Sequence, residues 1–70
     1  MKRKLLKTIM AKRRITQKEL AESCGISTSA FSKRLNGETE FTLEEIKILS
    51  RCLSLTDEAV MSIFFDSKVS

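Results

Sequence analysis

Residues 16–37, TQKELAESCGISTSAFSKRLNG, decide the fold. Thr16 and Glu19 have the spacing of a capping box, in which the threonine hydroxyl accepts from one backbone amide and the glutamate accepts from the other. Apolar residues then recur at helical spacing as far as Cys24. Gly25 follows where a left-handed residue would end a helix, since glycine carries no Cβ penalty there. We therefore expect a helix of about two turns that ends at Gly25.

A second short helix is predicted directly after this one. Ser27 is placed to cap it, Phe31 and Leu35 are spaced to face inward, and Gly37 marks its end. Ile26 is an apolar plug between the two helices. Two short helices joined by a three-residue corner that contains glycine form a helix-turn-helix.

Three further helices are expected around this motif, in one domain over residues 1–70. The first spans about residues 3–12, the fourth opens at a second capping box formed by Thr42 and Glu45, and the last runs from a cap at Thr56 to about Phe65. A polar tail follows from about residue 66. The residues predicted to face the core are Leu5, Leu6, Ile9 and Met10 in the first helix and Leu43, Ile46, Leu49, Cys52 and Leu53 in the fourth.

The composition argues against metal, cofactor and catalytic chemistry. The chain has two cysteines, Cys24 and Cys52, and no histidine, so it lacks the set of about four ligands that a zinc site needs. Both cysteines fall on predicted apolar faces, where a free thiol behaves as a small hydrophobic side chain. No general base is predicted beside a nucleophile. We expect no enzyme activity, no cofactor and no small-molecule substrate.

Charge is distributed unevenly along the chain. Residues 1–14 hold seven basic side chains and no acidic one, residues 15–34 have a balance of +1, and residues 35–70 have a balance of −4. A basic front with an acidic back suits a protein that presents one side to a polyanion, although a solvated helix face gives the same pattern. No apolar stretch approaches the roughly 20 residues of a membrane span, and no signal peptide is evident, so we expect a cytoplasmic protein without a membrane partner.

The helix-turn-helix residues carry a family resemblance. The segments TQKELAE (16–22), ISTSAFS (26–32) and LNG (35–37), with Gly25 between the first two, resemble the Cro/repressor-type helix-turn-helix proteins of phages and bacteria, also called the xenobiotic-response-element family. The resemblance covers about residues 2–65, and residues 41–46 and 63–65 resemble the small phage and Gram-positive members. It implies an all-α, five-helix, lambda-repressor-like domain with the helix-turn-helix at helices 2 and 3.

The same resemblance implies a function. Such proteins are transcriptional regulators, here a phage- or prophage-type repressor or a Cro-like protein. They bind a double-stranded DNA operator, usually as homodimers, in the nucleoid of a bacterial host cell.

The exposed face of the second motif helix supplies candidates for reading bases. On a helical wheel this face lies opposite Phe31 and Leu35 and carries small hydroxyl groups, one lysine and one asparagine, with no acid to repel phosphate. Because the N-terminal residues of a recognition helix reach the bases, the base-reading candidates are Thr28, Ser29 and Lys33.

Phosphate contacts are predicted for a second set of residues. The resemblance places Gln17, the first residue of the leading helix, at a phosphate. The full set of phosphate candidates is Gln17, Lys18, Ser27, Ser32, Asn36, Arg13 and Arg14. Structural roles stay open for three of them, since Gln17 suits a first helical turn, Ser27 a cap and Asn36 a helix end. Arg34, on the flank of the buried side, either snorkels or contacts DNA.

The sequence departs from the family pattern in two ways. Glu38 and Glu40 follow the recognition helix where basic or neutral residues usually approach phosphate. Met10 and Leu35 occupy positions that an ion pair often links, which predicts an apolar contact.

The last helix predicts a dimer. Val60, Ile63 and Phe64 form a core face, while Met61 and Phe65 widen the apolar arc to about 200°, well beyond the stripe of somewhat over 100° that one core needs. A twofold mate would cover the excess, with Met61, Phe64 and Phe65 at the interface. Alternatively, Phe65 folds over the tail or the first helix.

A second function stays open beside the regulator. The same fold serves antitoxin-like or adaptor proteins that bind other proteins, and such a module would tolerate substitution of Ser29 and Lys33 but not of Met61 and Phe65.

Overall fold

The computed structural model describes residues 1–65, which form five α-helices and no β-strand within that range. The helices are α1 (Arg3–Arg13), α2 (Gln17–Cys24), α3 (Thr28–Leu35), α4 (Leu43–Cys52) and α5 (Asp57–Phe64). The predicted all-α class, with a helix-turn-helix at the second and third helices, is confirmed. The predicted polar tail from about residue 66 lies outside the described residues.

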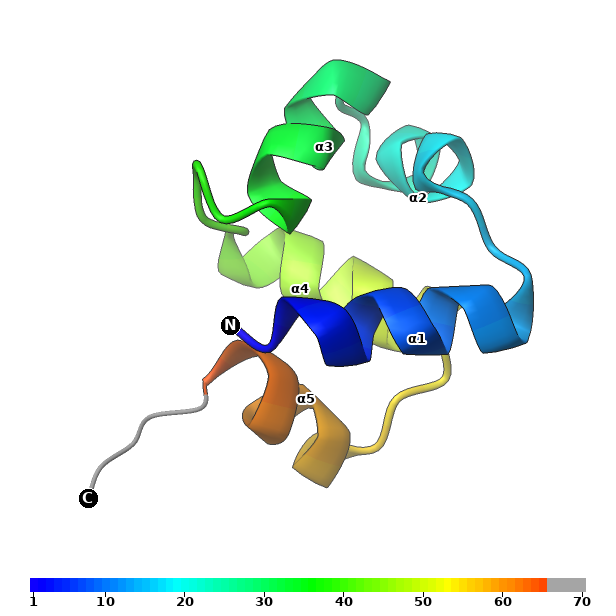
Figure 1. Cartoon of the computed structure of the whole chain (residues 1–70), viewed down its shortest axis with the longest axis vertical. Helices are drawn as coiled ribbons and strands as arrows, with labels where there is room; N and C mark the ends of the chain where they lie inside the picture. Colours follow the sequence, from blue (N-terminus) through cyan, green and yellow to red (C-terminus); the bar gives the residue numbers. More distant parts are fainter. Residues whose placement is uncertain (66–70) are drawn as a thin grey trace.

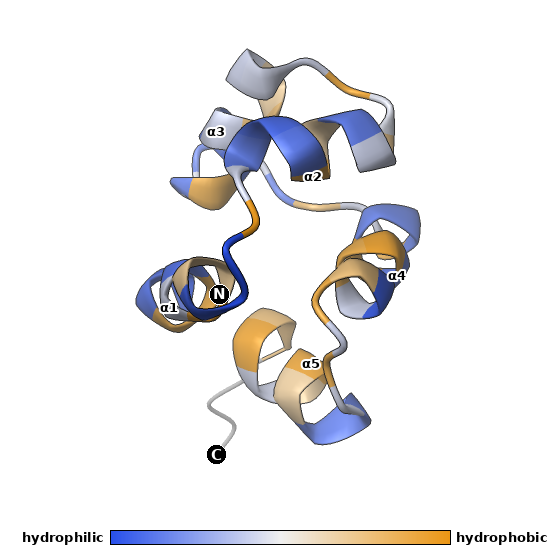
Figure 2. Cartoon of the chain, turned by 90° about the vertical axis from the view of Figure 1, so that its right-hand side faces the viewer, coloured by the Kyte–Doolittle hydropathy of each residue, from blue (hydrophilic) through white to orange (hydrophobic). Residues whose placement is uncertain are grey.

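The helix-turn-helix occupies one end of the molecule. In Figures 1 and 2, α2 and α3 lie together at the top, α5 lies at the bottom, and α1 and α4 lie between them. The N-terminus is held beside the end of α5, because the backbone amide of Lys2 donates to the carbonyl of Ile63 at 2.8 Å. This arrangement leaves α3 with one side on the body of the protein and one side outward.

Four of the helices begin at the caps that the sequence predicts. At α2, the amide of Glu19 donates to the Thr16 hydroxyl at 3.1 Å and the amide of Thr16 donates to the Glu19 carboxylate at 2.9 Å. The same reciprocal pair opens α4 at Thr42 and Glu45, at 3.1 and 3.0 Å. Ser27 and Thr56 cap α3 and α5 by accepting from backbone amides at 3.0 Å.

Left-handed backbone closes the turns between helices. Gly25 (φ 74°) and Gly37 (φ 85°) adopt it, as predicted at Gly25. Arg14 (φ 56°) and Ser54 (φ 53°) also adopt it, at the end of α1 and in the α4–α5 turn, although they carry side chains. The two non-glycine positions were not predicted.

One core joins all five helices. It is formed by nine buried side chains: Leu6, Met10, Leu20, Ala21, Phe31, Leu35, Leu49, Leu53 and Ile63. Met10 and Leu35 both belong to it, in agreement with an apolar link between α1 and the end of α3. Phe41 packs edge-on between Phe31 and Phe64, at ring-centroid distances of 5.5 and 5.7 Å.

Two residues predicted to face the core are exposed instead. Leu5 is 40% exposed and Leu43 is 68% exposed. Each lies roughly 90° around its helix from the centre of the face that the structure buries, so each falls at the edge of the stripe or beyond it. The prediction was wrong because it took every apolar residue near the stripe as part of the core.

Candidate nucleic-acid interface

The outward face of α3 is the candidate surface for reading DNA. Phe31 and Leu35 are fully buried, and they anchor the opposite side of the helix in the core. Because these two side chains determine which side of α3 faces the core, all three predicted base-reading residues are exposed on its surface: Thr28, Ser29 and Lys33. The exposure expected from the helical wheel is confirmed, and the role of these residues in reading bases stays a prediction.

The candidates for phosphate contact fall into two groups. Arg13, Arg14, Gln17 and Lys18 lie at the junction of α1 and α2, where Gln17 is the first residue of α2 and is half-buried while the other three are exposed. Ser27, Ser32 and Asn36 belong to α3 and its two ends, with Ser32 half-buried.

Ser27 has a structural role in the free protein. Its hydroxyl oxygen accepts from the amide of Ala30 at 3.0 Å, which is the cap alternative left open by the sequence. The hydroxyl proton remains available as a donor, since one hydroxyl both donates and accepts.

The electrostatics around α3 favour an anion. From Ser23 to Gly37 the chain carries Lys33 and Arg34 and no acidic residue, and because Arg34 is paired with Glu45 of α4, the exposed positive charge of this segment is that of Lys33. The first turn of α3 has no acidic side chain, so the positive end of the helix dipole is uncompensated there. Glu38 and Glu40 are exposed in the loop that follows, and they make the C-terminal side of this surface less favourable for phosphate.

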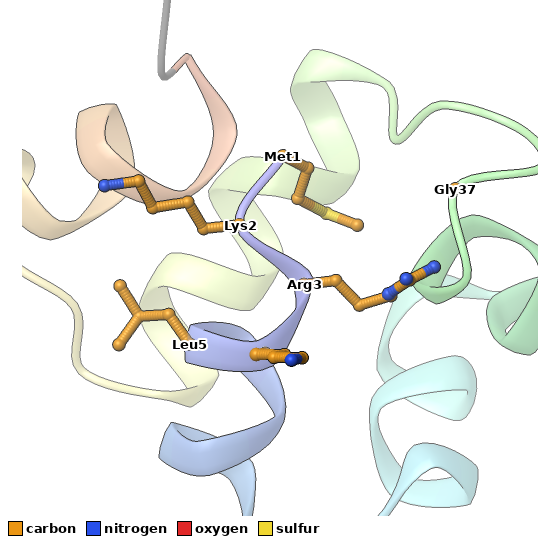
Figure 3. Close-up of a pocket in the computed structure, with 6 residues that line it drawn as sticks. Met1, Lys2, Arg3, Leu5 and Gly37 are labelled. Atoms are coloured by element: carbon orange, nitrogen blue, oxygen red, sulfur yellow. The ribbon is translucent and has the colours of Figure 1, made fainter.

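Two arginines near α3 have partners that the sequence did not reveal. The Nη1 of Arg3, in the first turn of α1, donates to the carbonyl of Asn36 at 2.7 Å. Figure 3 shows the Arg3 side chain reaching from the N-terminus of α1 toward Gly37. The Nε of Arg34 donates to the Glu45 carboxylate at 2.9 Å, so the two side chains form an ion pair. Glu45 was not predicted from the sequence as a partner of Arg34. These contacts join residues 33 and 11 positions apart, and no local pattern signals them.

The cysteines are free and half-buried. Burial raises the pKa of the Cys24 thiol above its ordinary value of 9.0, and the negative charge of Glu45 adds to the shift. The thiolate is the reactive form, so Cys24 is held in an unreactive state at neutral pH.

Among residues 1–65, the structure contains no group of three or more His, Cys, Asp or Glu side chains that could hold a metal ion. None of the helices in the same range has the length and apolar character that a membrane span requires.

The family described as winged helix-turn-helix DNA-binding matches residues 1–36, which are 36 of the 70 residues. The chain belongs to this family. The match spans α1, α2 and α3 and ends at Asn36, the C-terminal cap of α3. The helix-turn-helix identified here is thus a DNA-binding domain. No curated protein and no solved structure matches the chain.

Proposed function

We propose that this helix-turn-helix protein is a sequence-specific transcriptional regulator of the Cro/repressor type that reads an operator through the major groove. The observation that carries the proposal is the exposed polar face of α3, which lies opposite the buried Phe31 and Leu35. The part of the chain that follows the matched segment supports the Cro/repressor type. Within the described residues it consists of the helices α4 and α5 and contains no strand.

The chemistry of three side chains suits direct readout. The Lys33 ammonium donates to guanine O6 and N7, and the Thr28 methyl group contacts thymine. Ser29, with a hydroxyl that donates and accepts, suits several base edges. Thr28 and Ser29 lie in the first turn of α3, the part of a recognition helix that reaches base edges, and Lys33 lies in its last turn, where its long side chain extends its reach.

Phosphate contacts position the protein. We assign them to the seven candidates at the α1–α2 junction and on α3: Arg13, Arg14, Gln17, Lys18, Ser27, Ser32 and Asn36. Such contacts provide affinity and register without reading sequence. Glu38 and Glu40 weaken contacts from the loop after α3, so the α1–α2 junction provides the larger share.

A homodimer suits a twofold operator. Met61 is 57% exposed and Phe65 is 41% exposed, and both lie at the C-terminal end of α5 as an uncovered apolar surface. Phe64 packs partly on Phe41 of its own chain, so we expect it to contribute less to the interface than its neighbours. The dimeric domain would then act by occupying its operator, in the cytoplasm of a bacterial host.

Selection from random duplex DNA followed by titration of single-base variants tests the reader. We expect Lys33→Ala to lose about 1–3 kcal/mol of discrimination at one base position. Lys47→Ala is the matched control, because Lys47 is an exposed lysine on α4, outside the candidate interface. A uniform loss over all DNA sequences would make Lys33 a phosphate contact, and equal effects of the two variants would refute its role as a reader.

The exposed apolar residues also favour a second candidate, an antitoxin-like or adaptor module that binds another protein. Leu43, Met61 and Phe65 would then be the residues that resist substitution, while Ser29 and Lys33 would tolerate it. Affinity for DNA over a salt series separates the two functions, since phosphate neutralisation makes binding fall steeply with salt.

A further inference from the structure

Among residues 1–65, Glu45 is the charged residue that is buried, with 7% of its surface exposed. Its carboxylate forms hydrogen bonds with groups at the start of α4 and on α3. Its Oε1 accepts from the amide of Thr42 at 3.0 Å, which completes the cap of α4. The same oxygen accepts from the Nε of Arg34 on α3 at 2.9 Å. The start of α4 is therefore bonded directly to the recognition helix.

The arginine is itself held in a defined orientation. Its Nη1 donates to the carbonyl of Ala30, one turn earlier in α3, at 3.3 Å. Because the guanidinium is a planar fork, bonds from Nε and Nη1 together set its plane as well as its position. The side chain is 21% exposed and the Glu45 side chain is 9% exposed, so water competes little for this pair.

The packing of α3 shows why such a bond matters. Most backbone contacts of α3 are with α2, and it makes few with α4. Apolar contacts through Phe31 and Leu35 are not directional, whereas the ion pair restrains rotation of α3 about its own axis. On a helix with a side-chain radius of about 5–6 Å, a rotation of about 10° moves a side-chain tip by roughly 1 Å. Hydrogen bonds to base edges tolerate less than that.

We propose that Arg34 and Glu45 are positioning residues that set the rotation of α3 and thereby the discrimination between bases. The inference rests on the DNA-reading function proposed above. Arg34 does not read a base in this scheme, since its guanidinium is directed to Glu45 and Ala30. It acts through the neighbouring readers Ser29 and Lys33, whose outward direction depends on the rotation of the helix.

The test compares Glu45→Gln with Glu44→Gln. Glutamine retains an oxygen that can accept from the Thr42 amide and from the Arg34 Nε, so the cap of α4 is kept while the charge-assisted bond to Arg34 becomes a neutral bond of about half the strength. Glu44 is the exposed neighbour on the same turn, and its substitution changes the net charge equally. Both variants therefore gain the same non-specific attraction for DNA, and a difference between them reports the ion pair.

Two measurements are made under solution conditions in which both variants are folded. The first is the ratio of affinities for the duplex selected by the wild type and for random duplex DNA, which we expect to fall about threefold to thirtyfold in Glu45→Gln alone. The second is amide hydrogen exchange of the free protein, where we expect the α3 amides to exchange faster relative to those of α2 in Glu45→Gln alone. Arg34→Lys, which keeps the charge and loses the fork, replaces Glu45→Gln if that variant does not fold.

The two measurements separate the two proposals. Unchanged exchange in α3 would overturn the restraint, and faster exchange with an unchanged affinity ratio would show a purely structural ion pair and overturn the positioning role. A wild type that selects no duplex would refute the proposed DNA-reading function and the positioning role with it. Exchange would then still report whether the ion pair restrains α3.

Discussion

Arg14 holds a left-handed backbone at the turn that leads into the helix-turn-helix, with φ 56° and ψ 42°. A residue with a Cβ pays about 1–2 kcal/mol for this conformation, whereas glycine pays little. Glycine loses about 0.5–1 kcal/mol more in chain entropy on folding, so we expect Arg14→Gly to stabilise the protein by between about 0 and about 1.5 kcal/mol. For a domain of this size the melting temperature would rise by roughly 4–8 °C per kcal/mol.

Binding to DNA should change in the opposite direction. If Arg14 contacts a phosphate, its removal reduces the slope of log affinity against log salt by about 0.9. The ratio of the wild-type affinity to the Arg14→Gly affinity should then shrink by about 3.5-fold between about 50 and about 200 mM salt. An arginine retained in a strained conformation would thus trade stability for binding.

Ser54→Gly is the matched control. Ser54 has nearly the same strain, with φ 53°, but lies in the α4–α5 turn, away from α2 and α3. We expect it to stabilise the protein slightly more than Arg14→Gly, because Arg14 also interacts favourably with the negative end of α1, and to leave DNA binding unchanged. Unfolding is followed by circular dichroism, since the chain has no Trp or Tyr, and binding by anisotropy of labelled DNA. A salt slope of Arg14→Gly equal to that of the wild type would refute the phosphate contact, and a loss of stability in both variants would refute the strain.

Three further predictions concern stability and assembly. Thr16→Ala should destabilise the protein by about 1 kcal/mol by removing the cap of α2, while Thr39→Ala in the exposed α3–α4 loop should not; equal urea midpoints would contradict this. Phe65→Asp should convert a dimer into a folded monomer, and sedimentation that finds one monomeric mass for both wild type and variant would remove the dimer. Because the pKa of Cys24 is raised above 9.0 in the folded state, the wild type should lose stability as pH rises from about 8 to about 10, and Cys24→Ala should lose less; identical urea-midpoint profiles would refute it.

The sequence alone determined the features that depend on neighbours in the chain. The capping boxes at Thr16 and Thr42 and the turn at Gly25 involve residues within a few positions of one another, so their hydrogen bonds and backbone angles follow from local sequence. The exposed face of α3 was predictable for the same reason, since Phe31 and Leu35 lie one turn apart and indicate which side is buried. Its role in reading DNA stays a prediction.

Tertiary structure decided the rest. Leu43 has the spacing of a core residue, but the neighbours of α4 leave its direction open to solvent. The bonds from Arg3 to Asn36 and from Arg34 to Glu45 depend on how α1 and α4 are placed against α3, which no local pattern specifies. The periodicity of apolar residues identifies the side of a helix that is buried. The number of helices packed on that side and the angles between them determine how wide the buried face is and which charged side chains lie close together at its edge.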